Sequence, residues 1–396
     1  MLIGLVGKPS SGKSTFFQAL TSVAVERSER PFTTIKPNRA MGYVEVQCVD
    51  KDFNVQCNPR SGYCVNGRRF APVELLDVAG LVPGAHEGKG LGNKFLDDLR
   101  QADILIHIVD ASGSTNENGE AVEQGSHDPV KDVKFLEEEL DYWFKGILDN
   151  NWSKLMRENG LNKKPEEVMF QQFTGLGISR AAVQKTLKSL NLTDKNFAQW
   201  NSDDKFNFCK QLRENGKQII IAANKCDVGK GFENFQRIKS AFPEKLVIDC
   251  SAEEELTLKG ASKHGFISYI PGDAEFKELK PLTAEQKKAL DFIAGVLKKV
   301  GSTGVQKAVN TAVFDCLHYI AIFPGCVDNL VDSQGRILPD VFLLPPGSTA
   351  LDFAFALDTD LGKGFIKAVD VKLRRPVGKE HPLKHRDVIE LFFKKP

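Results

Sequence analysis

The sequence lacks any long hydrophobic run. No stretch of about 18 apolar residues is present, which is the minimum length expected of a membrane-spanning helix. No charged leader or apolar signal core stands at the start either, where Met1 runs directly into the short apolar segment Leu2–Val6. We therefore expect a cytoplasmic protein without a membrane partner.

Net charge and closely paired cysteines are also lacking. The formal net charge of the 396 residues is +1, so the overall field identifies no partner. The eight cysteines form no C-x-x-C pair, and in a reducing compartment most are expected to be small buried residues. Cys48, Cys57 and Cys64 are close in sequence, but their spacing matches no zinc pattern. A metal or redox role for these three stays open beside the simpler interpretation.

Length and composition indicate a globular protein of two or three domains. Hydrophobic residues make up 41% and charged residues 27% of the chain. The charge is uneven, because ten lysines or arginines stand against four acids between Leu361 and Pro396. This basic end is either an ordinary solvated face or a surface for an anionic polymer such as RNA. No DNA partner is expected.

A phosphate-binding loop follows the first predicted strand, Leu2–Val6. The segment "GKPSSGKST" contains the spacing G-x-x-x-x-G-K-S and leads into helix-forming residues. Its glycines let backbone N–H groups converge on phosphate oxygens, and the helix N-terminus adds positive potential. Lys13 is expected to reach the β- and γ-phosphates, and the Ser14 hydroxyl to bind Mg²⁺. The predicted nucleotide-binding residues of this loop are Gly7, Pro9, Ser10, Ser11, Gly12, Lys13, Ser14 and Thr15.

A second apolar strand, Val73–Leu76, delivers the motif "DVAG". The carboxylate of Asp77 can hold magnesium directly or through water, and the Gly80 N–H can donate to the γ-phosphate. Upstream, "RPFTTIKPN" offers Thr33 and Thr34, of which we expect Thr34 to bind the metal and the γ-phosphate. The predicted metal ligands are Ser14, Thr34 and Asp77, and the predicted catalytic residues are Lys13, Thr34, Gly80 and His86.

The position after this motif lacks a glutamine, which would orient the attacking water. Leu81 stands there instead, and its side chain neither donates nor accepts a proton. Losing such a group costs roughly 10²–10⁴ in rate, so we expect slow intrinsic hydrolysis. His86 is the only imidazole near this segment and can reach the site if the loop closes. The alternative is a solvated loop histidine.

Two later apolar strands, residues 219–222 and 246–248, end in segments suited to guanine. In "NKCD", the carboxylate of Asp227 can accept both donors on one edge of guanine, whereas adenine offers no such pair. Asn224 would bond the base or tie this loop to the phosphate loop. After the second strand, a backbone N–H at Ser251-Ala252 can meet guanine O6. The predicted base-binding residues are Asn224, Lys225, Asp227, Ser251 and Ala252, and the predicted substrate is GTP.

Strands alternate with helices, which predicts an α/β P-loop NTPase with a mostly parallel sheet. About 105 residues separate the strands on either side of Ser112–Gln218, where one crossover helix would suffice. A helical insert is therefore expected, beginning with a helix after Asp128-Pro129. Its apolar face carries Val133, Leu136, Leu140, Phe144 and Ile147. We predict three domains. They are a P-loop GTPase domain of residues 1–124 and 201–318, a helical insert of residues 125–200, and a β-grasp domain of residues 319–396.

The combined motifs resemble the Obg-type GTPases, and among them the YchF-related branch of archaeal and eukaryotic cells. The segments "RPFTTIKPN" and "DVAGLVPGAHEGKGLGNKFLDDLR" carry the resemblance more specifically than the general nucleotide motifs. The tail from "LPDVFLLPPGSTALDFAFAL" onward is similar to a TGS domain, a small β-grasp module that threonyl-tRNA synthetases also carry. The resemblance implies a regulatory GTPase that binds ribosomes or RNA through the TGS domain and the insert.

Two departures from the family pattern bear on this interpretation. Ser10 stands where Obg-like loops commonly have an asparagine. In some GTPases that asparagine helps to hold an activating potassium ion, so potassium dependence is not implied here. The best-known YchF-like members have lost the Asn-Lys-x-Asp motif and tolerate or prefer ATP, whereas this chain keeps it. Two alternatives stay open: an RNA-binding protein gated by nucleotide with incidental hydrolysis, and an ATP-accepting P-loop hydrolase or kinase.

Overall fold

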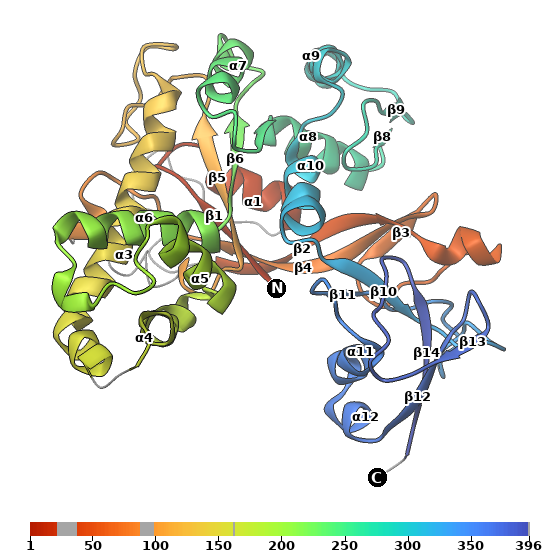
Figure 1. Cartoon of the computed structure of the whole chain (residues 1–396). Coiled ribbons are helices and arrows are strands. Elements are labelled where there is room, and N and C mark those ends of the chain that lie inside the picture. The colour runs from red at the N-terminus through yellow and green to blue at the C-terminus, as the bar shows by residue number, and fades with distance from the viewer. Residues whose placement is uncertain (22–37, 88–98, 161–162, 395–396) are drawn as a thin grey trace. The chain divides into compact units, whose positions relative to one another are not determined.

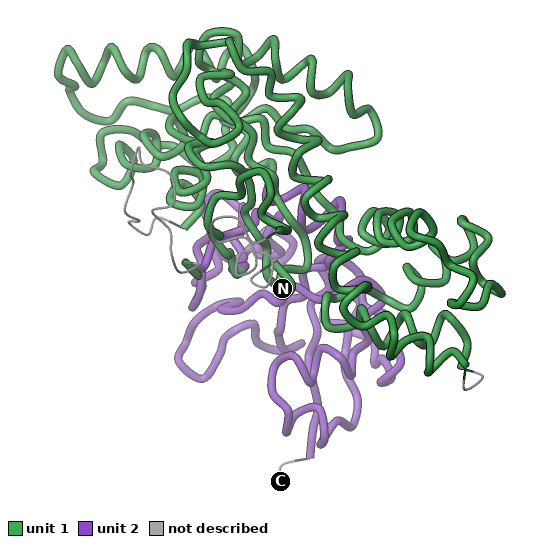
Figure 2. Tube along the Cα trace, turned by 90° about the vertical axis from the view of Figure 1, so that its left-hand side faces the viewer, with its two compact units in different colours: residues 1–40, 74–308 green, residues 41–73, 309–396 purple. Residues whose placement is uncertain are grey.

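The computed structural model describes residues 1–21, 38–87, 99–160 and 163–394 (Figure 1). The chain divides into two compact units, which Figure 2 colours separately. Unit 1 comprises residues 1–40 and 74–308, and unit 2 comprises residues 41–73 and 309–396. No helix among the described residues is long and apolar enough to cross a bilayer.

A seven-stranded sheet has the strand order β2-β4-β1-β5-β6-β7, and β3 pairs with β4. Its strands are β1 (Leu2–Val6), β2 (Asn38–Gln47), β3 (Tyr63–Val65), β4 (Arg68–Asp77), β5 (Ile104–Asp110), β6 (Ile219–Asn224) and β7 (Val247–Asp249). The pairs β1–β4, β1–β5, β5–β6 and β6–β7 are all parallel. Strands β1 and β5 are buried along their whole length, as parallel strands covered on both faces should be. The predicted mostly parallel α/β sheet is confirmed.

The helices around this sheet follow the expected alternation. They are α1 (Lys13–Thr21), α7 (Gly231–Ala241), α8 (Ala252–Lys263), α9 (Ala284–Val300) and α10 (Val305–Asn310). Helix α1 begins inside the phosphate loop and packs against α8. The short pieces η2 (Ala85–Glu87), β8 (Ile267–Ser268) and β9 (Lys277–Glu278) complete this part of unit 1. The nucleotide motifs therefore sit at strand ends, beside helix N-termini.

The helical insert has its own hydrophobic core. It contains α3 (Pro129–Gly160), α4 (Pro165–Phe173), α5 (Arg180–Ser189) and α6 (Ser202–Gly216), with η3 (Thr174–Leu176) and η4 (Phe197–Gln199) between them. These helices share one cluster of buried side chains, and they lie together in Figure 1. The sequence analysis did not predict α6, although Asn201 and Asp204 form a capping box at its start. Its residues Phe208, Cys209 and Leu212 complete the core.

Unit 2 contains a five-stranded sheet in the order β11-β10-β14-β12-β13. Its elements are β10 (Ile320–Pro324), β11 (Phe342–Leu344), α11 (Ala350–Leu357), α12 (Thr359–Lys363), β12 (Phe365–Asp370), β13 (Arg375–Val377) and β14 (Val388–Phe393). A buried core that includes Phe353 of α11 joins helix and sheet. The predicted β-grasp is confirmed. Before this sheet, α10 ends at Asn310, a π-helical segment covers Thr311–Cys316, and β10 begins at Ile320.

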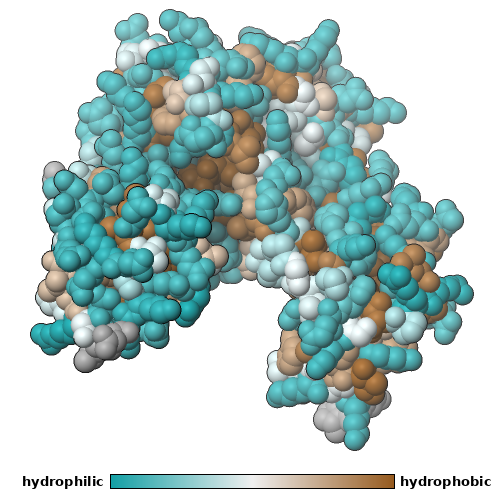
Figure 3. Space-filling model, viewed as in Figure 1, coloured by the Kyte–Doolittle hydropathy of each residue, from teal (hydrophilic) through white to brown (hydrophobic). Residues whose placement is uncertain are grey.

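The basic residues predicted on this unit are only partly available to a partner. Lys372 and Arg386 both pair with Asp52, at 2.6 and 3.0 Å. His385 is exposed, and its Nδ1 accepts a hydrogen bond from the Ala321 amide at 3.2 Å. The view in Figure 3 shows a mainly hydrophilic surface with small hydrophobic groups. In unit 2 the large exposed hydrophobic residues include Phe355, Ile366, Leu373, Phe392 and Phe393.

Candidate nucleotide-binding site

The loop between β1 and α1 has the backbone conformation of an anion cradle. Gly7, Ser10 and Gly12 all have positive φ angles, of 147°, 59° and 94°. A Cβ atom on Gly12 would lie 2.2 Å from the side-chain nitrogen of Asn224, so only glycine fits there. The Ser11 hydroxyl is buried and has no hydrogen-bond partner among the described residues.

Lys13 lies at the centre of this loop, and its side chain is 7% exposed. Its ammonium group donates to the Lys8 carbonyl at 2.9 Å. Burial lowers the pKa of Lys13 to about 8, and the opposing charge of Asp77 only partly offsets that effect. A bound polyphosphate would supply the negative charge that this buried ammonium needs.

Asp77 ends β4, the strand paired with β1, and therefore faces the same edge of the sheet as the loop. The Ser14 hydroxyl donates to its Oδ2 at 3.2 Å. Its Oδ1 is buried without a hydrogen-bond partner in the described part of the chain. Burial raises the pKa of Asp77, and a bound cation would reverse this effect. A hydroxyl and a carboxylate are hard oxygen donors, so these two residues fit a magnesium ion.

The remaining predicted phosphate and metal residues are placed only in part. Thr33 and Thr34 lie outside the described residues. The Gly80 backbone passes beside the cradle, since a Cβ atom there would lie 2.7 Å from Pro9 Cγ. The neighbouring Leu81 amide donates to the Gly7 carbonyl at 3.1 Å. The side chain of Leu81 is 1% exposed and belongs to the core beneath the sheet edge, so it serves packing.

His86 is held by helix α3 in this structure. Its backbone N–H and its Nδ1 lie 2.9 and 2.7 Å from Oε2 of Glu139. The other oxygen of Glu139 accepts from the Gly84 amide at 2.6 Å. The His86 ring also stacks on Tyr142, with centroids 4.7 Å apart. These contacts favour the structural interpretation of this histidine over the catalytic one.

Asn224 joins three loops at the end of β6. Its Nδ2 donates to the Ser11 carbonyl, and its Oδ1 accepts from the Ala252 amide, both at 3.0 Å. The Ser251 amide donates to the Thr303 carbonyl at 2.9 Å. In this structure both candidate amides for guanine O6 therefore have protein partners, and meeting the base would require one of them to change partner.

The Lys225 ammonium reaches back to the phosphate loop. It donates to the Ser10 carbonyl at 3.0 Å and lies 2.9 Å from Asp110 Oδ2. Burial would raise the pKa of Asp110, but Lys225 and the hydroxyls of Ser112 and Thr115 hold it below its usual value. Sequence analysis missed Asp110, and its position at the end of the buried strand β5 was the available signal.

Asp227 presents an unsatisfied acceptor. Its Oδ1 is buried and lacks a hydrogen-bond partner among the described residues. Burial first, and then the Asp227 carboxylate, raise the pKa of the nearby Glu254 to about 8. Asp227 also lines a cavity of about 370 Å³ together with Ser251 and residues of α9, including Phe292. This volume falls in the usual range of small-ligand sites.

These features define a P-loop nucleotide-binding protein of the GTPase class. They are the lysine-bearing loop between a buried strand and a helix, the aspartate on the adjacent strand, and the Asn224 loop. More narrowly, the chain belongs to the Obg-like GTPase family, in its YchF-related branch. A family model described as "50S ribosome-binding GTPase" matches residues 2–136. A model for the YGR210-like Obg-like GTPase, G4 motif-containing domain, matches residues 222–327. The TGS domain model matches residues 334–393.

Relatives cover the chain almost end to end. A GTP-binding protein of Methanocaldococcus jannaschii is 45% identical over 98% of this chain and 98% of its own length. A GTP-binding protein of Schizosaccharomyces pombe is 39% identical over 88% of each chain. The crystal structure of a GTP-binding protein from Pyrococcus horikoshii covers all of both chains at 36% identity, with a TM-score of 0.75.

The names of the relatives differ in the nucleotide that they give, since some name GTP and others name ATP. The ribosome-binding ATPase YchF of Bacillus subtilis is 30% identical over 67% of this chain and 70% of its own. The structure of a YchF GTPase from Schizosaccharomyces pombe matches 99% of this chain and 97% of its own chain at 17% identity, with a TM-score of 0.56. This similarity shows a shared fold. Membership of this family thus establishes a nucleotide hydrolase class without choosing between GTP and ATP.

Proposed function

We propose that this protein binds and hydrolyses GTP as a regulatory switch that acts on ribosomes or another RNA particle. The observation that carries the choice of GTP is the buried Oδ1 of Asp227, which has no hydrogen-bond partner in the described part of the chain and belongs to an intact Asn-Lys-x-Asp motif. Guanine offers two donors to such a carboxylate, whereas adenine would leave it buried and unsatisfied. Asn224, Lys225, Ser251 and Ala252 would complete the base site.

The proposed phosphate site consists of the loop from Gly7 to Thr15. Ser14, Asp77 and Thr34 would hold Mg²⁺, which would supply charge neutralisation at the β- and γ-phosphates. Lys13 would add its own charge, and the Gly80 N–H would donate to the γ-phosphate. The Oδ1 of Asp77 supports this assignment, because it is buried and has no hydrogen-bond partner among the residues that the structure describes.

The proposed hydrolysis relies on positioning rather than on a general base. Leu81 is buried and apolar, so it cannot orient water. His86 is bound to Glu139 and would have to leave that partner before reaching a phosphate. We therefore propose slow intrinsic turnover that a partner accelerates by ordering the loops around the γ-phosphate.

The TGS domain and the helical insert are the proposed contact surfaces for RNA. The TGS segment has a positive excess, and Lys367 lies over the exposed ring of Phe392, 4.9 Å from its centroid. Basic groups next to exposed aromatic rings suit single-stranded RNA, because bases stack while lysines neutralise phosphates. The proposed domain division is 1–124 with 201–318, 125–200, and 319–396, except that α6 (Ser202–Gly216) packs into the core of the insert and is counted with it.

Calorimetric titration with GTP and ATP tests the choice of nucleotide. GTP should bind more tightly by a factor on the order of 10² or more. Equal affinities would refute the guanine assignment. Asp227→Asn should shift preference toward xanthine nucleotides, whose edge offers an acceptor in place of a donor. The exposed Asp203→Asn serves as the matched control and should leave the preference unchanged.

Ribosome sedimentation tests the switch separately. The protein should co-sediment with ribosomes in the presence of a non-hydrolysable GTP analogue and be released with GDP. Equal binding with GTP, GDP and the analogue would reject a GTP-driven switch while leaving the nucleotide assignment intact. Lys363→Glu combined with Lys367→Glu should weaken co-sedimentation with ribosomes. It should not change how co-sedimentation depends on the bound nucleotide.

A further inference from the structure

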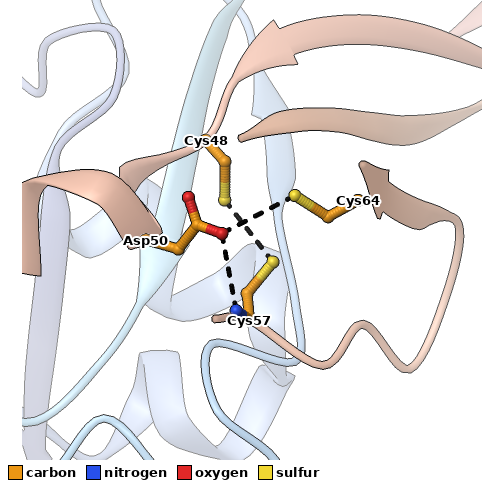
Figure 4. A group of neighbouring side chains, drawn as sticks. All are labelled: Cys48, Asp50, Cys57 and Cys64. Atoms are coloured by element: carbon orange, nitrogen blue, oxygen red, sulfur yellow. Dashed lines mark hydrogen bonds between the residues drawn. The ribbon is translucent and has the colours of Figure 1, made fainter. Parts of the chain in front are cut away.

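Three cysteines and an aspartate of unit 2 converge on one point, although they are spread over 17 residues of sequence (Figure 4). One ligand atom from each of Cys48, Asp50, Cys57 and Cys64 lies within 4.8 Å of every other. Cys48 follows β2, and Asp50 lies in the first turn of the short helix η1 (Val49–Phe53). Cys57 lies in the following loop, and Cys64 belongs to β3.

Two of the separations match the edges of a tetrahedral site, and all of them lie within 4.8 Å. With metal–ligand bonds of about 2.0–2.3 Å, the donor atoms of a tetrahedral zinc site are about 3.3–3.8 Å apart. The Cys48 and Cys57 sulfurs are 3.6 Å apart, and the Cys64 sulfur is 3.8 Å from Asp50 Oδ2. The donor set of three thiols and one carboxylate also has the composition that zinc accepts.

A second observation concerns Asp50 itself. Its side chain is fully buried, at 0% exposure. Oδ2 accepts a hydrogen bond from the Cys57 amide at 3.4 Å, whereas Oδ1 has no hydrogen-bond partner among the described residues. A buried carboxylate with an unused oxygen is costly unless it is paired or bound to a cation. The thiol cluster next to it provides the place for that cation.

Positive charge nearby would offset the excess negative charge of such a site. The Arg69 guanidinium lies close enough to Cys57 to interact with it electrostatically. Arg69 is fully buried and is fixed by hydrogen bonds to the carbonyls of Leu338 and Pro339, at 3.1 and 2.7 Å. A buried guanidinium in this position suits thiolates better than thiols.

We propose that Cys48, Asp50, Cys57 and Cys64 form a structural zinc site in unit 2. With four protein ligands, the site has no position left for substrate, so its role is structural. A disulfide between Cys48 and Cys57 is the competing use of these residues. It would leave Cys64 and the buried Asp50 without a function, whereas a metal uses all four.

The contacts around the site show what the metal would hold in place. The loop between Asp50 and Cys64 donates from the Asn58 amide to the Ile337 carbonyl, and from the Arg60 amide to the Pro339 carbonyl, at 2.8 and 2.9 Å. Arg60 also pairs with Asp340 at 2.6 Å. The zinc would therefore fix the loop on which the first part of the TGS segment rests.

Metal analysis of the full-length protein tests the proposal directly. Protein expressed with added zinc and passed through gel filtration should retain about one zinc ion per chain. Cys57→Ser and Cys64→Ser should each lower this content at least about tenfold, since a three-ligand site holds zinc far less tightly. Cys326→Ser removes an exposed cysteine outside the cluster and should keep the full content.

Cobalt substitution reports the ligands without relying on activity. Co²⁺ in the wild-type protein should give thiolate-to-cobalt charge-transfer bands in the near ultraviolet and visible bands typical of a tetrahedral site. Asp50→Asn should keep the charge-transfer bands but shift the visible ones, whereas Cys57→Ser should weaken both. A folded wild-type protein that takes up neither zinc nor cobalt would overturn the proposal, as would a Cys48–Cys57 disulfide in protein alkylated at lysis.

Removing zinc from the wild-type protein with a chelator tests the proposal without any variant, so the test does not depend on whether a variant folds. A zinc chelator should lower the thermal unfolding midpoint and speed hydrogen exchange in residues 54–64 and 337–340. Zinc, but not magnesium, should restore both. Unchanged exchange and an unchanged midpoint after complete removal of zinc would contradict a structural role.

Discussion

Lys8 of the phosphate loop and Asp132 of the first turn of α3 form a buried ion pair, with the ammonium 2.8 Å from Oδ2. Their side chains are only 1% and 4% exposed. Lys8 also accepts the hydrogen bond from Lys13 through its carbonyl. The long helix that opens the insert is thus joined to the residue that would bind the phosphates, within unit 1.

Asp132→Asn should destabilise the protein by about 3–5 kcal/mol, because it leaves the Lys8 charge buried without its partner. Nucleotide affinity should also fall, since Lys8 positions Lys13. Urea denaturation and calorimetry measure the two effects. Asp128→Asn is the matched control: Asp128 pairs with Arg237 at the surface, at 3.3 Å, and its loss should cost at most about 1 kcal/mol. Equal costs for both variants would contradict the structural argument.

Glu139→Ala should release the loop around His86 from α3. The carboxylate accepts from the Gly84 and His86 amides, and each charged hydrogen bond contributes about 1.5–3 kcal/mol. Hydrogen exchange at these two amides should therefore become about 10- to 100-fold faster. The exposed neighbour Glu138→Ala should leave exchange unchanged. Single-turnover hydrolysis in the same variants would reveal whether holding this loop slows the reaction.

The pKa of Lys13, lowered to about 8 by burial, predicts proton uptake on nucleotide binding. Above this pH the ammonium of the free protein loses its proton, whereas a bound polyphosphate favours the charged form. Affinity should therefore fall as the pH rises above about 8, and binding near pH 8.5 should take up a proton. Calorimetry in two buffers of different ionisation enthalpy measures the uptake. Near pH 7 it should vanish, and its absence at both pH values would contradict the prediction.

Glu254 should make stability fall as the pH rises. Burial, and then Asp227, raise the pKa of Glu254 from 4.5 to about 8, so the folded state holds a proton that the unfolded state releases. The free energy of unfolding therefore decreases between about pH 4.5 and pH 8. Glu254→Gln should flatten this profile and be more stable than the wild type above pH 8. The exposed Glu253→Gln is the control, and a wild-type profile in Glu254→Gln would contradict the argument.

Much of the α/β framework was predictable, because its signals are local. Apolar runs such as Leu2–Val6 specify buried strands, and the turn from Gly7 to Ser14 requires glycines that the sequence displays. The insert was predictable from the length of the crossover and from the apolar face of α3. The helix α6 was missed because its apolar face is short.

The sequence by itself determined which chemical groups stand at the ends of which strands, because strand and loop patterns depend on neighbouring residues. Tertiary structure alone decided which of these groups meet. The burial of Leu81, the pairing of Lys8 with Asp132 and the convergence of Asp50 with three cysteines all join segments through packing. Such contacts depend on how the sheet and the helices pack around a core, and the spacing of residues within one segment does not predict this packing.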